Sequence, residues 1–246
     1  MPGSSKEMRL FPYGVYLEGL LAIADLHLGY EDALRERGVE LPYEQYPRIK
    51  GAIIRLISDF SPDKVIIVGD VKHEFGTALN QEWREVLDLI KTIRGMGVEL
   101  EVVRGNHDNF LIPILRKEGI EIKDYLVEAG IMFVHGHKPF IPPDNVNLIV
   151  MGHEHPAVAL RDELGAGHKM KAFLKAKFMD RELLVLPALS PLAPGTDVLQ
   201  SYGNFLSPAL RSIDPSEITV LVADDELWLV EELGPLNLVR KAAGVI

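Results

Sequence analysis

The nine residues 100–108, LEVVRGNHD, lead from a short apolar segment directly into Asn, His and Asp. Leu100 to Val103 reads as a buried strand, because apolar and β-branched residues fill a run of strand length. The same arrangement occurs four more times along the chain. Strands are predicted at 20–24, 65–68, 131–134 and 148–151, and each is followed within three residues by Asp or His. If these strands lie side by side, their polar residues converge at one sheet edge, where open α/β sheets bind ligands.

The polar residues that follow the five predicted strands are of metal-binding types. In chain order they are Asp25, His27, Asp70, Asn106, His107, Asp108, His135, His137, His153 and His155. Imidazole, carboxylate and amide groups together fit hard or borderline divalent cations such as Mn, Fe, Ni or Zn. The chain has no cysteine, which excludes thiolate ligands and disulfides. Each motif alone is a common strand cap, so the prediction rests on their joint occurrence in order.

A dinuclear site needs a carboxylate that can bridge two cations. Asp70 is the natural candidate, because it stands alone after its strand. Two cations about 3.5–4 Å apart can share a hydroxide and hold the oxygens of a phosphoryl group.

Helical and strand periodicities divide the chain into two parts. Residues 45–58 and 82–94 place apolar side chains at helical spacing between the first strands. After Met151 the pattern changes to strands without long helices, at 157–160, 169–178, 182–186, 218–223 and 226–231, with Asp224-Asp225 as a hairpin turn. We expect an α/β protein with two packed sheets and outer helices, forming one domain over residues 1–246, with the motifs at 25–155 and a β-rich half at 156–235.

The charge and hydropathy of the chain restrict its partners. The formal net charge is −10, which argues against an extended groove for duplex DNA. Residues 1–9 contain no apolar signal segment, and no apolar run approaches the ~18 residues that span a bilayer. We therefore expect a soluble, cytoplasmic protein that does not bind membranes; its oligomeric state stays open.

The motifs DLH, GDVKH, GNHD, HGH and GHEH resemble the motif series of the calcineurin-like metallophosphoesterases, from about Asp25 to His155. The resemblance implies a four-layer α/β/β/α sandwich with two mixed sheets and two divalent metal ions. It assigns Asp25, His27, Asp70 and His155 to one metal, and Asp70, Asn106, His135 and His153 to the other. It also implies that His107 contacts the phosphate and protonates the leaving group.

The GDVKH motif resembles one branch of this family more than others. Serine/threonine protein phosphatases carry Asp-Arg-Gly after the corresponding Asp, whereas this chain has Val71-Lys72-His73-Glu74. The form seen here is similar to nuclease subunits of double-strand-break repair complexes, to archaeal SbcD-related phosphoesterases and to DNA-ligase-associated phosphoesterases. This likeness implies that His73 helps to position catalysis and the scissile phosphate. The motifs and closing strands use nearly all 246 residues, so we expect no capping domain that would shape duplex DNA.

The favoured function is therefore a two-metal phosphodiesterase, with a metal-bridging hydroxide as nucleophile and Mn as the preferred cation. A small or single-stranded phosphodiester, such as a nucleotide or single-stranded nucleic acid, is the expected substrate. The alternatives are a phosphomonoesterase, a DNA nuclease of the repair type, and a scaffold without catalysis. The last is disfavoured because His107 and every ligand position are present.

Other polar residues leave two interpretations each. His137 is an alternate ligand or a hydrogen-bonding group near the substrate, and Asp108 orients His107 or caps the next helix. Glu154 is expected in solvent or in a supporting hydrogen bond, and His168 in a loop. Lys169, Lys171, Lys175 and Lys177 are expected on a solvated strand face, with nucleic-acid contact as the alternative. The Pro-, Gly- and Ser-rich stretch 187–215, with Ser190, Asn204 and Ser207, is expected to be a long loop that lines the site.

Overall fold

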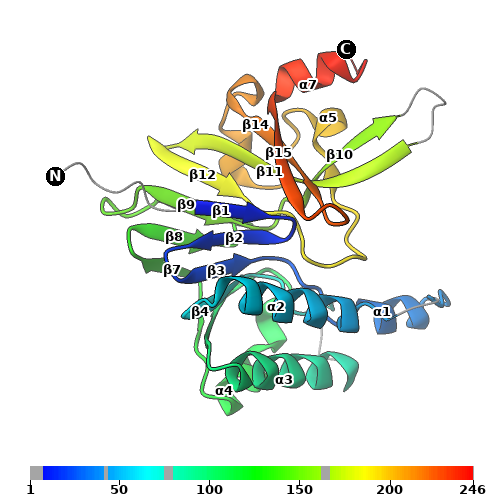
Figure 1. Ribbon diagram of the computed structural model, residues 1–246, viewed down its shortest axis with the longest axis vertical. Coiled ribbons are helices and arrows are strands. Elements are labelled where there is room, and N and C mark those ends of the chain that lie inside the picture. The colour runs from blue at the N-terminus through cyan, green and yellow to red at the C-terminus, as the bar shows by residue number, and fades with distance from the viewer. Residues whose placement is uncertain (1–7, 42–43, 75–79, 162–166, 246) are drawn as a thin grey trace.

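The protein folds into four layers, two sheets packed face to face with helices on both outer sides (Figure 1). The computed structural model describes residues 8–41, 44–74, 80–161 and 167–245. The first sheet has the order β1-β2-β3-β4-β5-β6, and β3 to β6 run parallel. Its strands are β1 (Met8–Phe11), β2 (Gly14–Leu17), β3 (Leu20–Ile23), β4 (Lys64–Val68), β5 (Glu99–Val103) and β6 (Ile122–Lys123).

The second sheet has the order β13-β10-β11-β12-β9-β8-β7, with β14 pairing with β11 and β15. It is mixed: β8, β9 and β12 are parallel neighbours, and most other pairs are antiparallel. Its strands are β7 (Tyr125–Glu128), β8 (Ile131–Val134), β9 (Leu148–Met151), β10 (Pro156–Arg161), β11 (Gly167–Phe178), β12 (Arg181–Val185), β13 (Thr196–Asp197), β14 (Thr219–Asp224) and β15 (Leu229–Pro235).

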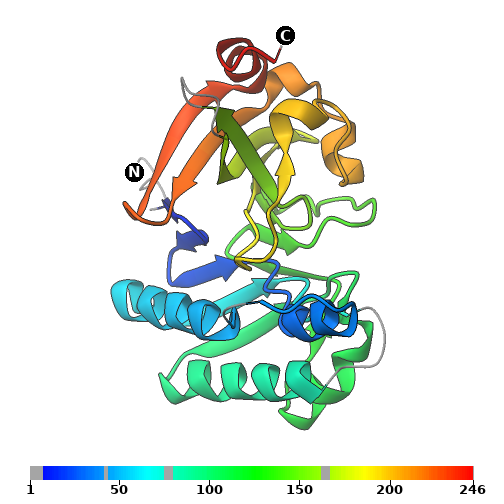
Figure 2. The same cartoon turned by 90° about the vertical axis from the view of Figure 1, so that its right-hand side faces the viewer.

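Helices cover the outer face of each sheet, as Figures 1 and 2 show from two sides. The first sheet carries α1 (Tyr30–Glu36), α2 (Tyr46–Phe60), α3 (Asn80–Gly95), the 3-10 helix η1 (Asp108–Phe110) and α4 (Ile112–Lys117). The second carries α5 (Val198–Ser201), α6 (Pro208–Arg211) and α7 (Leu236–Ala242), and η2 (Pro215–Glu217) precedes β14. The predicted α/β/β/α sandwich is thereby confirmed.

Alternation along the strands produces three apolar layers. In β4, Val65 and Ile67 pack against helices α2 and α3, whereas Ile66 and Val68 point to the second sheet. Successive side chains of a strand face opposite sides of the sheet. A strand made only of apolar residues therefore packs into the apolar layers on both sides. A third apolar layer lies between the second sheet and its helices. The five ligand-bearing strands are buried on both faces for this reason.

Several elements differ from expectation. The stretch 187–215 contains β13, α5 and α6, and these short elements are too brief to give a periodic signal. The expected strand 226–231 is instead β15 at Leu229–Pro235, because the turn after β14 is longer than two residues and includes Trp228 at φ 56°. His168 lies in β11 rather than in a loop. The hairpin of β1 and β2 and the helices α1 and α4 were not expected.

In the described part of the chain, no helix is both long and apolar enough to cross a membrane. The expectation of no signal segment concerns residues 1–9, and residues 1–7 lie outside the described part of the chain.

The inter-sheet layer makes a prediction about stability. Phe173 of β11 is fully buried there, so Phe173→Ala should lower the free energy of unfolding by about 3–5 kcal/mol. Urea unfolding would measure the change. Leu227→Ala is the control, because Leu227 is 70% exposed and its loss should cost less than about 0.5 kcal/mol. Equal effects of both substitutions would contradict the assigned core.

Candidate metal centre

The carboxyl ends of five strands meet at the seam between the two sheets. Within the first sheet, the Asp25 amide donates to the Gly69 carbonyl at 3.1 Å. Two further contacts cross between the sheets. The His153 amide, after β9, donates to Asp25 Oδ2 at 2.9 Å, and His135 Nδ1, after β8, lies 3.2 Å from the Val68 carbonyl. The polar groups therefore converge between two sheets, rather than along the edge of one as the strand pattern alone indicated.

One group of potential ligands comes from β3, β4 and β9. Side-chain atoms of Asp25, His27, Asp70 and His155 lie within 4.8 Å of one another. His27 Nε2 is 3.3 Å from His155 Nε2, and His155 Nε2 is 3.3 Å from Asp25 Oδ2. All but His155 are buried.

A second group shares Asp70 with the first. Asp70, His135 and His153 also lie within 4.8 Å of one another. The Asn106 carbonyl oxygen Oδ1 is 3.0 Å from His135 Nε2, which itself is 3.4 Å from Asp70 Oδ2. The two groups and Asn106 make up the candidate metal centre. Its seven members are Asp25, His27, Asp70, Asn106, His135, His153 and His155.

The donor set of the candidate metal centre fits divalent cations. Two facing imidazole nitrogens, such as those of His27 and His155, can share only one proton, whereas a cation accepts a lone pair from each. Among the described residues, the buried Asp25 Oδ1 accepts no hydrogen bond, and its ion-pair contact is His135 Nδ1 at 3.5 Å. A buried carboxylate oxygen of this kind is costly unless a cation or donor meets it. Nitrogen and oxygen ligands in this mixture suit first-row divalent metals.

The backbone at the candidate metal centre is strained. Asp25, His27, Asp70, His153 and His155 all have positive φ, between 46° and 69°. Residues other than glycine rarely adopt this left-handed region, and each instance costs of order 1 kcal/mol or more. Such strain persists only where the surrounding structure holds it, and it gathers at functional sites. Here it turns each chain sharply after a strand and directs the side chain into the seam.

Glycines permit the close approach of the loops. A Cβ atom on Gly105 would lie 2.0 Å from Asp70 Oδ1, and one on Gly69 would lie 2.1 Å from His135 Nδ1. Neither position can carry a side chain without displacing a predicted ligand. The glycines of the GD and GN motifs therefore belong to the geometry of the centre.

The histidines of the candidate metal centre differ in the direction in which their pKa is shifted. Burial and the neighbouring His155 lower the pKa of His27 to about 3, and burial and His135 lower that of His153 to about 4. For His135, burial favours the neutral ring, but the carboxylates of Asp70 and Asp25 outweigh it and raise the pKa to about 9. Burial opposes ionisation of Asp70 too, yet the charge of His135 holds its pKa well below the usual range. Without a cation, one proton on His135 thus balances part of the carboxylate charge.

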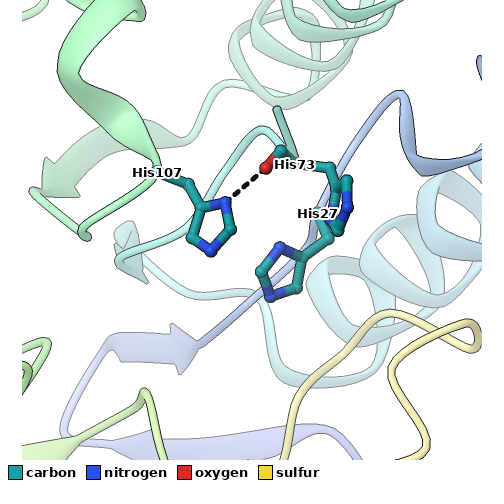
Figure 3. Close-up of side chains that lie close together, drawn as sticks. All are labelled: His27, His73 and His107. Atoms are coloured by element: carbon teal, nitrogen blue, oxygen red, sulfur yellow. Dashed lines mark hydrogen bonds between the residues drawn. The ribbon is translucent and has the colours of Figure 1, made fainter. Parts of the chain in front are cut away.

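His107 and His73 lie beside the candidate metal centre (Figure 3). His107 Nδ1 donates to the backbone carbonyl of His73, which fixes the ring and leaves Nε2 directed at the site, 3.8 Å from Asp70 Oδ2. The His107 amide also donates to Asp70 Oδ1 at 3.0 Å. The His73 ring stacks on Tyr30, with centroids 3.7 Å apart, and forms a third close group with His27 and His107. The hydrogen bond between the two residues thus involves the His73 carbonyl, while the His73 ring lies beside those of His27 and His107.

The carboxylate of Asp108 ties two motif loops together. It accepts hydrogen bonds from the amides of Gly105 at 2.8 Å and Val71 at 3.0 Å, and it lies 3.4 Å from the amide of Lys72. Burial and the nearby Asp70 raise the pKa of Asp108 to about 7. These partners are amides of the motif loops, and the orientation of His107 by Asp108 stays a prediction. The amides of Val71 and Lys72 lie 37 and 36 residues away, so no local pattern indicated these two partners.

Three further polar residues lie in the motif loops or contact them. His137 is half-buried, with its ring centroid 5.2 Å from His135, and it belongs to neither donor group formed by the described residues. Glu154 is fully buried and accepts from the amides of Leu206 and Ser207 at 2.9 and 3.0 Å, so the solvent-exposed alternative is wrong. Ser207 Oγ also donates to the Gly136 carbonyl at 2.9 Å, and the stretch 187–215 is thereby bound to the motif loops.

A buried polar chain supports the loop of His27, and sequence reasoning missed it. Gln45 Nε2 donates to the His27 carbonyl at 2.7 Å, and Ser190 Oγ donates to Gln45 Oε1 at 2.8 Å. Lys171 Nζ then donates to the Ser190 carbonyl at 2.7 Å. Burial lowers the pKa of Lys171 to about 7, which corrects the expectation of a fully solvated lysine face. Gln45 stood only at the start of an expected helix, and nothing in the spacing linked it to Ser190.

Residues 20–141 match the family model of the calcineurin-like phosphoesterases. The chain belongs to this family. A Pseudomonas putida nuclease, MPE, has a similar crystal structure, with a TM-score of 0.65 at 20% identity over 93% of this chain and 96% of that one. The Escherichia coli phosphoesterase YfcE matches at TM-score 0.42 and 15% identity over 88% and 98% of the two chains. A predicted phosphoesterase from Streptococcus pneumoniae matches at 0.33 and 16%, over 88% of each chain. No curated protein matches the sequence.

As a calcineurin-like phosphoesterase, the chain is a metal-dependent hydrolase of phosphoric esters with a dinuclear site for divalent metals. The likeness to the Pseudomonas putida nuclease establishes a shared fold.

The role of Gly105 can be tested by substitution. Gly105→Ala should weaken Mn²⁺ binding by roughly 10–100-fold, because the new methyl group must displace the Asp70 carboxylate. Isothermal titration calorimetry would measure the affinity. Gly51→Ala is the matched control, since Gly51 is exposed in α2 and a Cβ there meets no atom of the described residues within 4 Å. An unchanged affinity in Gly105→Ala would show that Asp70 is not a ligand.

Metal binding should also release protons. His135, with a pKa of about 9, is protonated below that pH in the metal-free protein, whereas a metal ligand must be neutral. Binding at pH 7.5 should therefore expel at least about one proton. The contribution from His135 should disappear as the pH rises through 9, where the ring is already neutral. Calorimetry in buffers of different ionisation enthalpy would count the protons; none released at pH 7.5 would contradict this assignment.

Proposed function

We propose that this phosphoesterase is a two-metal phosphodiesterase acting on small or single-stranded substrates. Asp25, His27, Asp70 and His155 would hold one cation, and Asp70, Asn106, His135 and His153 the other. The observation that carries the proposal is the position of Asp70, whose carboxylate belongs to both donor groups. A shared carboxylate between two sets of nitrogen and oxygen ligands is the arrangement that a dinuclear hydrolytic site requires.

The bound cations would neutralise charge on the phosphoryl oxygens and lower the pKa of water. The chain's own residues orient these groups. The His153 amide and Gly69 carbonyl hold Asp25, and the His107 amide holds Asp70 Oδ1. The two amide contacts limit rotation of the carboxylates, and the Gly69 contact holds the Asp25 backbone. Manganese is the proposed cation, because mixed imidazole, amide and carboxylate ligands without sulfur suit it.

His107 is the proposed proton donor to the leaving group. Its Nδ1 proton is bound to the His73 carbonyl, so Nε2 is the nitrogen that exchanges a proton with the substrate. The Nε2 atom lies 3.8 Å from Asp70 Oδ2, close to the shared carboxylate.

Two observations favour a phosphodiester over a phosphomonoester as the substrate. Residues 69–73, GDVKH, resemble nucleases rather than protein phosphatases, and the structurally similar Pseudomonas putida protein is a nuclease. Side-by-side assays of bis-p-nitrophenyl phosphate and p-nitrophenyl phosphate with Mn²⁺ would test this choice. Faster diester hydrolysis is expected, and faster monoester hydrolysis would establish the phosphomonoesterase alternative instead. Lack of turnover of both with Mn²⁺, Ni²⁺, Zn²⁺ and Fe²⁺ would overturn the proposal.

Substitution of His107 provides a sharper test of the mechanism. His107→Ala should reduce kcat about 10²–10⁴-fold for a thymidine dinucleotide, whose alkoxide leaving group needs a proton. The loss should be much smaller for bis-p-nitrophenyl phosphate, because nitrophenolate leaves without protonation. His168→Ala is the control, since His168 is an exposed histidine of β11. Equal losses on both substrates would contradict the role as proton donor.

A further inference from the structure

A pocket opens beside the candidate metal centre on the outer face of the second sheet. Its volume is about 310 Å³, within the range of small-ligand sites, and both His135 and His137 line it. Met132 and Val134 of β8 form an apolar floor. Tyr125 of β7 pairs directly with Val134, so its ring stands on the same face and forms one wall.

Aromatic rings give this pocket a flat, rigid shape. Tyr125 is 51% exposed, although most of the strand residues around it are buried or half-buried. Phe140 also lines the pocket, and its ring is held 5.3 Å from that of Phe178. An exposed tyrosine beside an apolar floor offers a stacking surface for a planar ring, which costs little entropy because the side chain has few rotatable bonds.

The side of the pocket nearest the candidate metal centre carries one cation, Lys138, next to His137, whose ring stays neutral because burial and His135 lower its pKa to about 4. The His137 ring lies 5.2 Å from that of His135 and 6.1 Å from that of His153. Asp124 also lines the pocket, but its carboxylate is 3.8 Å from Arg104, which offsets its charge. One pocket is therefore lined by a predicted metal ligand, His135, by the cation of Lys138 and by the ring of Tyr125.

We propose that this pocket binds the nucleobase of a nucleoside whose phosphate ester is held at the candidate metal centre. The proposal rests on the proposed phosphodiesterase function and names its substrate class. Phosphate requires the cation of Lys138 and the metal site, and a base requires the flat apolar wall. A nucleotide ester carries both groups in this order. Tyr125 is the residue that selects the nucleotide ester.

Two chromogenic diesters with the same leaving group test the proposal with Mn²⁺ present. Thymidine 5′-(p-nitrophenyl phosphate) carries a base, whereas methyl p-nitrophenyl phosphate does not. We expect kcat/KM to favour the thymidine ester by roughly tenfold in the unmodified protein. Tyr125→Ala should abolish this preference by lowering kcat/KM for the thymidine ester roughly tenfold more than for the methyl ester, and Tyr125→Phe should retain it because the ring remains. Leu227→Ala, at a 70% exposed site in the turn between β14 and β15, is the control.

The possible outcomes separate the two proposals. Turnover of both esters without preference, or equal loss of both in Tyr125→Ala, would overturn the base pocket and leave the phosphodiesterase standing. Lack of turnover of either ester would overturn the phosphodiesterase and the pocket with it. Phenyl p-nitrophenyl phosphate adds one more arm. A rate equal to that of the thymidine ester would show that any aromatic group suffices, and the nucleoside assignment would be wrong.

Discussion

The apolar layer between the two sheets is the constraint on which the candidate metal centre depends. Val68, Val103, Phe133 and Val150 belong to this layer, and each lies within three residues of a predicted ligand in its own strand or loop. Close packing allows the strands little freedom to slide, so the separation of the two sheets sets the separation of the ligands. The strained backbone at the strand ends is tolerable because this packing holds it. A change of volume in the layer is therefore a change in the geometry of the site.

A buried ion pair lies near the candidate metal centre, on the side of the first sheet that the helices cover. Lys72, directly after the loop of Asp70, is completely buried, with its Nζ 3.9 Å from Glu82 Oε2 of α3. Glu82 also accepts from the amide of Glu74 at 2.7 Å. Removing one partner of such a pair would leave an uncompensated charge in the interior, which is strongly destabilising. Helix α3 thus packs its apolar face on the first sheet and, through Glu82, binds the GDVKH loop.

The strands, the main helices and the ligand positions could be predicted because their signals are local. Each ligand follows an apolar strand by at most four residues, and periodicity identifies such strands directly. The rest depends on contacts distant in sequence. The bond from Ser190 to Gln45 spans 145 residues, and the carboxylate of Asp108 binds amides in another motif. Lys171 was expected in solvent because alternate lysines usually mark an exposed face, but its long side chain turns inward to two carbonyls. No window of sequence contains both members of such pairs.

The span between the first and last ligands has a consequence for biosynthesis. The contact between His153 and Asp25 joins residues 128 positions apart, and Ser190, which supports the loop of His27, comes later still. A chain emerging from the ribosome presents Asp25 and His27 long before β9 and the Ser190 segment exist. Pairings between residues so distant in sequence form late, because packing must first offset the entropy cost of closing the loop between them. The nascent protein therefore cannot assemble the complete ligand set until the chain has been made beyond His155, nor support the loop of His27 until it has been made beyond Ser190.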